Sequence, residues 1–546
     1  MDDNLDRRVF LKNSLIAGAV ALAGGSALVG CTPTSTEESP SSTTTEAAPD
    51  ALNNQPSYMN RSPIGEPSET VKADFIVCGA GGCGLSAALQ AQELGLNVIL
   101  LEKKETAGGT FGFSEVTFAV GSRFQTEAGI EKSLEEVIRD ILEYNHYIPS
   151  HALLQAWLAQ SADTIDWVQT FGCEFEFRQL TSLNSFGHFY KGDTLKGAGF
   201  EFIQHFIDTA EQRGIDIRYK TAAKELLVEN EKVTGILAVY DDKTVIKFEA
   251  PAVLVSTGGW GNNEEMLRAL AKVNPERVTA SGYDGRDGDG VIMARSAGAA
   301  FARGEGTVMF YGPLVPGSNW GDELQTGAAQ CTLWVNESGE RFMDEGGPHQ
   351  MHRGMTIRDL KRMFVIQSQA DVDFFTDVGP WITNSGHTPK ETPMTKFREL
   401  LQNQIDTKNE RIFVADTIEE LAEKAGIDKD TFAATVSRYN ELVDKGIDED
   451  FLKPVQYLTP LKEGPFYAFE SNDAFYTTVG GVKINANTQV LDENGEVIPG
   501  LYAGGVDAGG LCGDTYDFQS APGEQSSWAM NSGRLAAKHA AEYIKG

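Results

Sequence analysis

Basic side chains are scarce in this chain of 546 residues. Lys and Arg together number 46 against 78 Asp and Glu, which gives a formal net charge of −32 at pH 7. A protein that binds nucleic acid needs a basic face for the phosphate backbone, so we expect no nucleic-acid partner. The charge does not define a substrate, because it acts mainly on solubility and non-specific association.

Paired cysteines are missing as well. None of the 6 cysteines forms a C-x-x-C pair or a C-x-x-C-H haem motif; they are Cys31, Cys78, Cys83, Cys173, Cys331 and Cys512. An exported disulfide scaffold would show a denser set, so disulfides are not expected to hold this fold. Cys78 and Cys83 are predicted to be small buried side chains. His349 and His352 lie on a Gly/Pro-rich stretch without other ligands nearby, so we predict loop histidines and no metal site.

The N-terminal region is typical of an exported lipoprotein. Arg7 and Arg8 precede an apolar stretch, Ser14–Gly30, that is short for a membrane span. It ends in "LVGC", which resembles the site where a lipoprotein is cleaved and Cys31 is lipidated. We therefore expect twin-arginine export and a location on the extracytoplasmic face of the cell membrane, with a plain N-terminal anchor as the alternative. The Ser/Thr/Glu/Pro-rich run that follows predicts a flexible tether.

The stretch "DFIVCGAGGCGLSAALQAQELGLNVILLE" has the pattern of a βαβ dinucleotide-binding unit. An apolar strand leads into G-x-G-x-x-G and a helix, and a second apolar strand ends in Glu102. Gly79 allows the tight turn, Gly81 lets the backbone approach a pyrophosphate, and Gly84 permits close helix–strand packing. Glu102 can accept hydrogen bonds from a ribose hydroxyl.

Further glycine-ended strands indicate FAD rather than NAD. They carry "AGGT" (107–110), "STGG" (256–259), "GRDGDG" (285–290) and "GLYAGG" (500–505). A second glycine loop suits the remainder of a larger dinucleotide. The spread of these motifs along the chain predicts one large sheet interrupted by an insertion.

From about Lys72 onward the chain resembles the flavoprotein subunits of the fumarate reductase/succinate dehydrogenase family. The resemblance rests on "CGAGGCG", "EKKETAGG", "STGG", "NESGERFMDE", "TVGGVKIN" and "GLYAGGVDAGG" in this order. It implies an α/β fold in which a split Rossmann-like FAD-binding domain holds an inserted α+β capping domain. It also implies transfer of a hydride from flavin N5 to one carbon of an activated C=C, and of a proton to the other.

The resemblance also implies the domain order and the cofactor contacts. The predicted segments are the export signal 1–31, the tether 32–70, a first FAD-binding segment at 71–310, the capping domain 311–465 and a second FAD-binding segment at 466–546. The predicted FAD contacts are Gly79, Gly81, Gly82, Gly84, Glu102, Lys103, Gly108, Gly109, Thr110, Thr257, Gly258, Gly259, Asp289, Gly504, Gly505, Asp507 and Ser526.

The proton donor in soluble members of this family is an arginine that follows the "ERF" motif. Here "MTIRD" supplies Arg358, with Asp359 beside it. Guanidinium is an unusual acid because its pKa is above about 12. The match is imperfect, since "GGPHQMHRG" is extra before Met355, and Arg353 is therefore the alternative.

Dicarboxylate reductases of the family hold both carboxylates with histidines and arginines that this chain lacks. The corresponding positions carry Phe310, Tyr311, Thr326, Gly327, Gln330, Tyr476, Thr477 and Tyr516. Burying two carboxylates without cations costs several kcal/mol each, so fumarate is not the expected substrate.

Aromatic side chains predict instead a pocket for a larger and flatter molecule, although each of them could equally belong to a core. They are Phe310, Tyr311, Trp334, Tyr476 and Tyr516. A positioned tyrosine can act as a general acid, so Tyr311 or Tyr516 could replace or assist Arg358.

Two helical segments complete the prediction. Residues 417–446 are amphipathic at helical spacing and predict a pair of capping-domain helices. The segment after Gly523 predicts a C-terminal helix whose first amides, by the resemblance, face the flavin N1/C2 carbonyl.

These observations favour a lipid-anchored FAD ene-reductase that acts on an enoate or enone larger and less anionic than fumarate. Since the sequence shows no haem motif or covalent-flavin module, electrons are expected from a separate quinol- or cytochrome-linked membrane donor, which would make this a terminal reductase of anaerobic respiration. The sequence leaves open a dehydrogenase of a cyclic ketone such as a 3-ketosteroid, and a non-catalytic ligand-binding lipoprotein.

Overall fold

The computed structural model describes residues 56–180, 184–193, 195–304, 306–315, 317–318, 321–346, 350–382 and 388–546. The predicted export signal, Cys31 and His349 lie outside these residues. The side chains of Tyr311 and His352 also lie outside the described residues. None of the described helices is long and apolar enough to span a bilayer.

A six-stranded sheet gathers the predicted glycine-ended strands, as expected from the sequence. Its order is β18 (Gln489–Leu491), β19 (Val497–Ala503), β11 (Ala252–Val255), β2 (Phe75–Cys78), β3 (Val98–Leu101) and β7 (Asp216–Arg218). All neighbours pair in parallel except β18, which is antiparallel to β19. Because the inner strands are buried on both faces, they are continuous apolar runs. The split α/β fold predicted from the sequence is confirmed.

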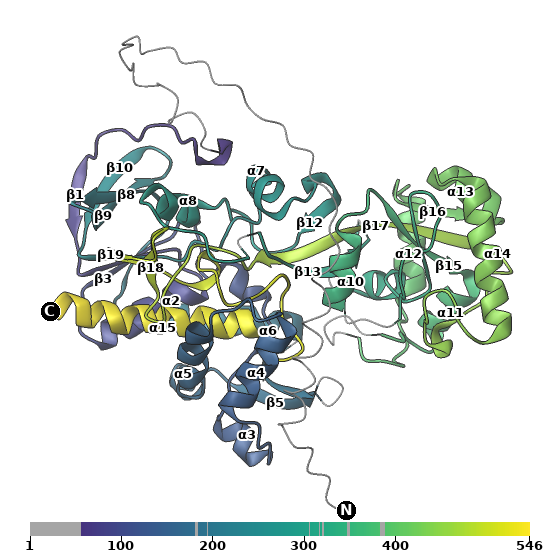
Figure 1. Cartoon of the computed structure of the whole chain (residues 1–546), viewed down its shortest axis with the longest axis horizontal. Helices are drawn as coiled ribbons and strands as arrows, with labels where there is room; N and C mark the ends of the chain where they lie inside the picture. Colours follow the sequence, from purple (N-terminus) through teal and green to yellow (C-terminus); the bar gives the residue numbers. More distant parts are fainter. Residues whose placement is uncertain are drawn as a thin grey trace, which may run out of the picture. The chain divides into compact units, whose positions relative to one another are not determined.

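Helices and smaller sheets surround this central sheet (Figure 1). The helices are α2 (Gly82–Glu93), α3 (Arg123–Glu127), α4 (Leu134–Tyr144), α5 (His151–Gln169), α6 (Leu195–Gln212), α7 (Glu264–Met266), α8 (Asp289–Ser296) and α15 (Glu524–Lys545). One further sheet contains β1 (Glu69–Lys72), β10 (Thr244–Glu249), β9 (Lys232–Tyr240) and β8 (Thr221–Glu229). Another contains β4 (Val116–Thr117), β6 (Ser185–Tyr190) and β5 (Phe175–Leu180). Helix α15 packs along α2, so the C-terminal helix covers the first βαβ unit.

The capping domain is built on a second six-stranded sheet. Its strands are β12 (Val278–Ala280), β17 (Phe466–Thr478), β15 (Met363–Ser368) and β14 (Leu333–Asn336), and β13 (Val308–Leu314) and β16 (Ile412–Ala415) also pair with β17. Its helices are α9 (Glu323–Ala328), α10 (Gln350–Ile357), α11 (Gln369–Asp377), α12 (Phe397–Asp406), α13 (Ile418–Ala425) and α14 (Lys429–Lys445). The pair α13 and α14 confirms the helices predicted within 417–446. Strands β13 and β17 lead from the capping sheet back to the FAD-binding elements (Figure 1).

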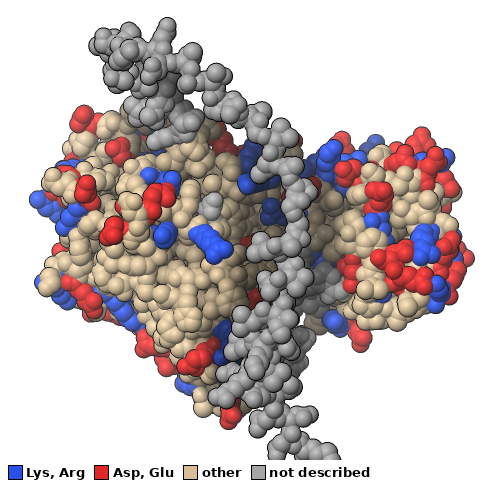
Figure 2. Space-filling model, viewed as in Figure 1, with Lys and Arg blue, Asp and Glu red and all other residues tan. Residues whose placement is uncertain are grey.

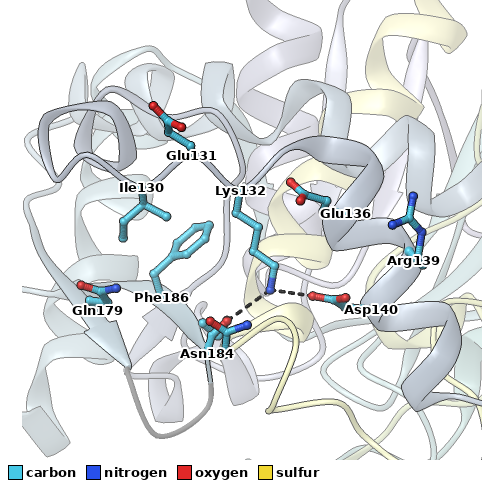
Figure 3. A pocket seen from close by; sticks show the side chains of 10 residues that line it. Ile130, Glu131, Lys132, Glu136, Arg139, Asp140, Gln179, Asn184 and Phe186 are labelled. Carbon is cyan, nitrogen blue, oxygen red and sulfur yellow. Dashed lines mark hydrogen bonds and ion pairs between the residues drawn. The ribbon is translucent and has the colours of Figure 1, made fainter. Parts of the chain in front are cut away.

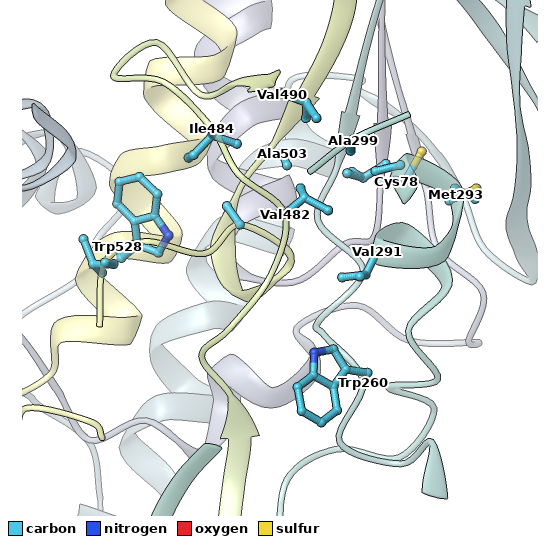
Figure 4. Close-up of a cluster of buried hydrophobic side chains, with 14 of the residues drawn as sticks. Cys78, Trp260, Val291, Met293, Ala299, Val482, Ile484, Val490, Ala503 and Trp528 are labelled. Carbon is cyan, nitrogen blue, oxygen red and sulfur yellow. The ribbon is translucent and has the colours of Figure 1, made fainter. Parts of the chain in front are cut away.

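Apolar side chains fill the space between the central sheet and its covering elements. One cluster joins Cys78 on β2, Val291 on α8 and Ala503 on β19 with Trp260 and Trp528 (Figure 4). Each of these side chains is buried. Fully burying a large apolar side chain stabilises the fold by about 1.5–3 kcal/mol, so this cluster holds the glycine-ended strands in register.

Acidic and basic side chains are interspersed over the capping-domain surface (Figure 2). Ion pairs there include Arg438 with Asp450 at 2.8 Å and Lys462 with Asp444 at 2.5 Å. Such exposed pairs contribute about 0–1 kcal/mol each, so the fold rests on the cores rather than on surface charge.

The predicted tether is too long at its C-terminal end. Within 32–70, the 3-10 helix η1 (Ser57–Met59) buries Tyr58, and Arg61 pairs with Asp289 at 2.9 Å. Strand β1 begins at Glu69 and pairs with β10. The aromatic side chain and the ion pair anchor this segment, which the low-complexity composition of residues 32–50 did not reveal.

Candidate active site

The first glycine loop has the backbone shape that the fingerprint predicts. Gly79 follows β2 with φ +102°, a conformation that favours glycine. A Cβ on Gly84 would lie 1.8 Å from the carbonyl oxygen of Gly79, so α2 approaches the strand as closely as backbone atoms allow. Gly81 is the N-cap of α2, and Gly82 packs against the ring of Phe111. The loop therefore presents the amino end of a helix, which favours an anion.

The second glycine loop lies directly beside the first. The amide of Gly108 donates to the carbonyl of Ala80 at 2.8 Å, and Gly81 and Gly108 form a parallel bridge. Gly109 begins the 3-10 helix η2 (Gly109–Phe113) with φ +53°. Thr110 accepts a hydrogen bond from the amide of Tyr283 at 3.3 Å, which joins this loop to the one that precedes α8.

Glu102 holds the two loops in position. Its Oε2 accepts from the amide of Ala80 at 2.9 Å, and its Oε1 accepts from the amide of Lys104 at 2.8 Å. A carboxylate oxygen can accept more than one hydrogen bond, so both oxygens keep the capacity to accept from a ribose hydroxyl, as predicted.

Whether a dinucleotide fits depends on the free space beside the glycines of the three loops. A Cβ built on Gly81 would meet nothing nearer than 3.9 Å, and one on Gly109 nothing nearer than 3.8 Å. A Cβ on Gly258 would have only Arg286 near it, at 3.6 Å. These three glycines therefore have free space where a side chain would be, whereas Gly79 and Gly84 are in close contact with backbone atoms. The residues present therefore fit a pyrophosphate-containing cofactor.

Asp507 fastens the third glycine loop. It ends the 3-10 helix η7 (Gly505–Asp507) and is fully buried. Its Oδ2 accepts from the amide and the hydroxyl of Thr257, and its Oδ1 accepts from the amide of Gly259 at 2.8 Å. Burial raises the pKa of Asp507, and the donated hydrogen bonds of Thr257 and Gly259 oppose that shift. The carboxylate thus fixes Thr257, Gly258 and Gly259 against the last glycine motif.

Gly504 and Gly505 pack against the first glycine loop through Cys83. A Cβ on Gly504 would lie 2.6 Å from Cys83 Sγ, and the amide of Gly505 donates to Ser532 Oγ at 2.9 Å. Burial raises the pKa of the Cys83 thiol to about 12, so it remains a neutral packing group. All cysteines among the described residues are unpaired and buried, Cys78 included.

Lys103 and Asp289, two of the predicted FAD contacts, form an ion pair with each other. Lys103 Nζ lies 2.9 Å from Asp289 and 2.8 Å from Asp287. Burial disfavours the Asp289 carboxylate, but the charges of Lys103, Lys224 and Arg61 outweigh it and lower its pKa to about 2. Sequence reasoning missed Arg61, because nothing in the local pattern links it to a residue so far along the chain.

Helix α15 begins beside β4, at the end of the second glycine loop. Its N-cap Gly523 has φ +83°, and a Cβ there would lie 2.3 Å from the carbonyl oxygen of Val116. Ser526 is buried and donates to the same carbonyl at 2.6 Å, while Trp528 Nε1 donates to the carbonyl of Gly505 at 2.9 Å. The start of α15 is therefore locked to both glycine regions, and the predicted cap at Gly523 is confirmed.

The loop between η7 and α15 meets the capping strands in a small apolar cluster. The cluster contains Cys512 and Tyr516 of the loop, Leu314 of β13, and Ala474 and Val479 of β17, with Met309, Tyr476 and Phe518 packed on it. Two of the predicted pocket residues, Tyr476 and Tyr516, are thus brought together at the junction of the two domains.

Two other predicted pocket residues belong to cores. Trp334 is fully buried in the capping domain, where its Nε1 donates to the carbonyl of Gln330 at 3.0 Å. Phe310 is 1% exposed and packs edge-on against Phe475. A single aromatic residue in a strand does not reveal which face it occupies, so the sequence could not separate core from pocket here.

The residues before Arg358 form a helix, which corrects the sequence-based interpretation. The supposed extra segment supplies the start of α10, so His352 and Arg353 lie on a helix rather than a loop. Gly354 lets α10 approach β13, since a Cβ there would lie 2.8 Å from the amide nitrogen of Gly312. Arg358 comes immediately after this helix.

The two candidate arginines have different surroundings. Arg358 is half-buried, contacts Asp359 at 3.3 Å and places its guanidinium 5.8 Å from the ring of Phe310. Arg353 is buried over Trp334, and burial lowers its pKa. Phe310 in turn packs against Phe475, whose ring lies beside Gly261 in the loop that follows Gly259.

Two buried carboxyl groups at the start of α15 escaped sequence reasoning. Glu524 and Asp517 are both 0% exposed, and neither forms an ion pair with a described residue. Burial raises the pKa of Asp517 to about 6, and burial and the neighbouring Asp517 raise the pKa of Glu524 well above its ordinary value. Only the placement of α15 on the loop could have shown that these acids meet.

Unpartnered polar atoms also gather near this helix start. Thr117 Oγ1, Tyr190 Oη and His188 Nδ1 are buried and have no hydrogen-bond partner within the described residues. Burial lowers the pKa of His188 to about 4, so its imidazole is neutral near pH 7. Ser526 at the start of α15 is among the polar neighbours of Tyr190, so these groups lie beside the helix start.

A separate hollow of about 320 Å³ lies away from the glycine loops. Lys132 contacts Asp140 and the carbonyl of Asn184 across it (Figure 3). Its lining is polar and charged. Across the described ranges, no cluster of His, Cys, Asp and Glu has an arrangement that could hold a metal ion.

Comparison with known proteins identifies the family. Residues 74–520 match the model of the FAD binding domain family. The chain belongs to the FAD-dependent fumarate reductase/succinate dehydrogenase flavoproteins. It is similar to the vinyl phenol reductase of Lactiplantibacillus plantarum, with 32% identity over 86% of this chain and 96% of that protein.

Other members of this flavoprotein family support the same assignment. A fumarate reductase (cytochrome) of Shewanella frigidimarina is 29% identical over 88% of this chain and 78% of that protein. The structure of the open conformation of a flavocytochrome c3 fumarate reductase matches with a TM-score of 0.69 and 26% identity, over 88% of this chain and 79% of that one. The cofactor of this flavoprotein is FAD, and the enzyme is an oxidoreductase that acts on CH–CH groups.

Proposed function

We propose that this flavoprotein reduces the C=C bond of an uncharged α,β-unsaturated or vinyl-aromatic compound that is larger than fumarate. The observation that carries the proposal is the pair of buried carboxyl groups, Glu524 and Asp517, which lie near Tyr516, the position that corresponds to a cation in the family's dicarboxylate reductases. A dianionic substrate at this junction would find no cation among the described groups around Glu524, and its burial would cost several kcal/mol. The similarity to a vinyl phenol reductase supports an uncharged aromatic substrate.

FAD supplies the hydride when it is bound. The chain's own residues supply the rest: the glycine loops hold the pyrophosphate, and Tyr476 and Tyr516 offer an apolar wall at the domain junction. Arg358 is our choice of proton donor, because it follows the "ERF" motif as the proton-donating arginine of the family does, and has Asp359 beside it to re-supply the proton. Arg353 is the alternative, and Tyr311 and Tyr516 are the candidate assisting acids.

The enzyme is further proposed to be exported by the twin-arginine route and anchored through lipidated Cys31, with a separate membrane electron donor. The order of Arg7, Arg8, the apolar stretch and "LVGC" supports this location. Expression of Cys31→Ala in a bacterial host with a lipoprotein pathway tests it. The variant should move from the membrane to the soluble fraction, and an unchanged membrane fraction would contradict lipidation at Cys31.

The substrate class is tested anaerobically with the flavin reduced by dithionite. Re-oxidation of the flavin is followed after addition of 4-vinylphenol, a cyclic enone, dimethyl fumarate or fumarate, with free reduced FAD as the control for direct chemistry. Rapid re-oxidation by the uncharged compounds supports the proposal. Re-oxidation by fumarate alone would overturn it.

A further inference from the structure

Glu524 occupies an unusual place for a carboxyl group. It is the first residue of α15, directly after Gly523, and none of its side chain is exposed. Its Oε2 lies 3.6 Å from Cys512 Sγ, while its Oε1 has no hydrogen-bond partner among the residues that the structure describes. An isolated buried carboxylate is far more costly than a buried neutral acid.

The surroundings of Glu524 are short of positive charge. The titratable groups that face it are Cys512, Tyr516 and Asp517 of the preceding loop and Tyr144 of α4. From β4 comes Thr117, which lies against Gly523 at the start of α15. None of the described groups that shift the Glu524 pKa is a cation. The helix N-terminus favours the carboxylate, but burial and the neighbouring acid oppose it more strongly.

Glu524 is also next to the junction where we place the substrate. Cys512, its contact, belongs to the apolar cluster that contains Tyr516, Val479 and Tyr476. Thr117 lies on the other side of the helix start, since a Cβ on Gly523 would be 2.8 Å from Thr117 Cα, and its Oγ1 is another buried atom without a partner among the described residues. The buried Glu524 Oε1, without a partner among the described residues, is free to bind a polar group of a ligand.

We propose that Glu524 works as a neutral carboxylic acid that donates a hydrogen bond from its carboxyl group to an uncharged oxygen of the substrate. This inference rests on the proposed function and adds to it a specificity-determining residue. A neutral acid can donate to a phenol or carbonyl oxygen, whereas a carboxylate can only accept. No proton leaves Glu524 in this role, because the hydride comes from the reduced cofactor and the proton from a separate donor.

The protonation state is tested first, independently of turnover. Infrared difference spectra of flavin-loaded wild type and Glu524→Gln at pH 7 should show the C=O stretch of a protonated carboxylic acid that is lost in the variant. The matched control is Glu542→Gln, which makes the same change at a position of α15 that is not buried. A difference spectrum with only carboxylate bands would overturn the inference.

The substrate contact is tested by kinetics with an uncharged substrate from the panel. Glu524→Ala should raise KM about tenfold, the effect of one lost hydrogen bond, while flavin content and flavin spectrum stay as in wild type. In wild type the donated hydrogen bond is lost when Glu524 ionises at alkaline pH, so KM should rise there. Glu524→Gln keeps an N–H donor at every pH, so its KM should stay within about threefold of wild type and should lack this rise. If Glu524→Ala leaves KM unchanged, or alters flavin binding and not KM, the proposed contact of Glu524 with the substrate is wrong.

Failure of this inference can be told apart from failure of the proposed function. If wild type reduces uncharged substrates and Glu524→Ala does so with the same KM, only the role of Glu524 is wrong. If wild type reduces no uncharged substrate, the proposed function is wrong and the substrate contact is wrong with it.

Discussion

Asp507→Asn tests how the glycine loops are held. In wild type the two carboxylate oxygens of Asp507 accept three hydrogen bonds from Thr257 and Gly259. An asparagine of the same shape has one oxygen that can accept hydrogen bonds. Its NH₂ group replaces the other oxygen and would face the N–H or O–H groups that donate to that oxygen in wild type. At least one buried donor then loses its acceptor, which costs about 1–3 kcal/mol, and the remaining bonds lose the assistance of the charge.

We therefore expect Asp507→Asn to lower the free energy of unfolding by about 2–4 kcal/mol. The assay is guanidinium unfolding of the flavin-free protein, followed by tryptophan fluorescence, since Trp260 and Trp528 are buried beside this turn. The control is Asp514→Asn, at a side chain that is 56% exposed. Equal unfolding midpoints for the two variants would refute the role assigned to Asp507.

Three further predictions address separate regions of the site. Gly84→Ala places a Cβ 1.8 Å from a backbone oxygen, so the purified variant should contain little FAD by absorbance. The control is Gly95→Ala, which also changes a glycine, with φ +81°, but has open space around the added Cβ and should keep its FAD. The lowered pKa of Asp289 means that its carboxylate stabilises the fold above the unfolded pKa of 3.8 and that this stabilisation is lost as pH falls to about 2. Between these pH values the melting temperature of Asp289→Asn should therefore change less than that of wild type. Arg358→Ala should abolish turnover with FAD still bound; normal turnover would transfer the role to Arg353 or a tyrosine.

Much of the FAD-binding half follows from local sequence. Continuous apolar runs identify β2, β3 and β11, because strands buried on both faces need them. Glycine motifs follow β2, β11 and β19, where a cofactor leaves no room for side chains. The amphipathic period of residues 418–445 likewise identifies α13 and α14. These features depend on neighbouring residues alone.

Features that depend on distant contacts could not be predicted. The pairing of Arg61 with Asp289 joins residues that are 228 positions apart, and their spacing in the sequence carries no signal. The burial of Asp517 and Glu524 likewise depends on how the loop and α15 pack against the rest of the fold. The helix that contains Arg353 was hidden by His, Gly and Pro residues around its start, which are typical of loops. The FAD contacts and the proton donor remain predictions that the arrangement of the loops supports.

The central claim is that this flavoprotein reduces an uncharged C=C substrate, and one pair of compounds tests it most directly. Fumarate and dimethyl fumarate share the reacting bond and differ in charge. The ratio of their kcat/KM values, measured with reduced viologen on one preparation, should favour the ester by at least about a hundredfold, as expected when burying uncompensated charge costs about 3 kcal/mol or more. A ratio that favours fumarate would contradict the account.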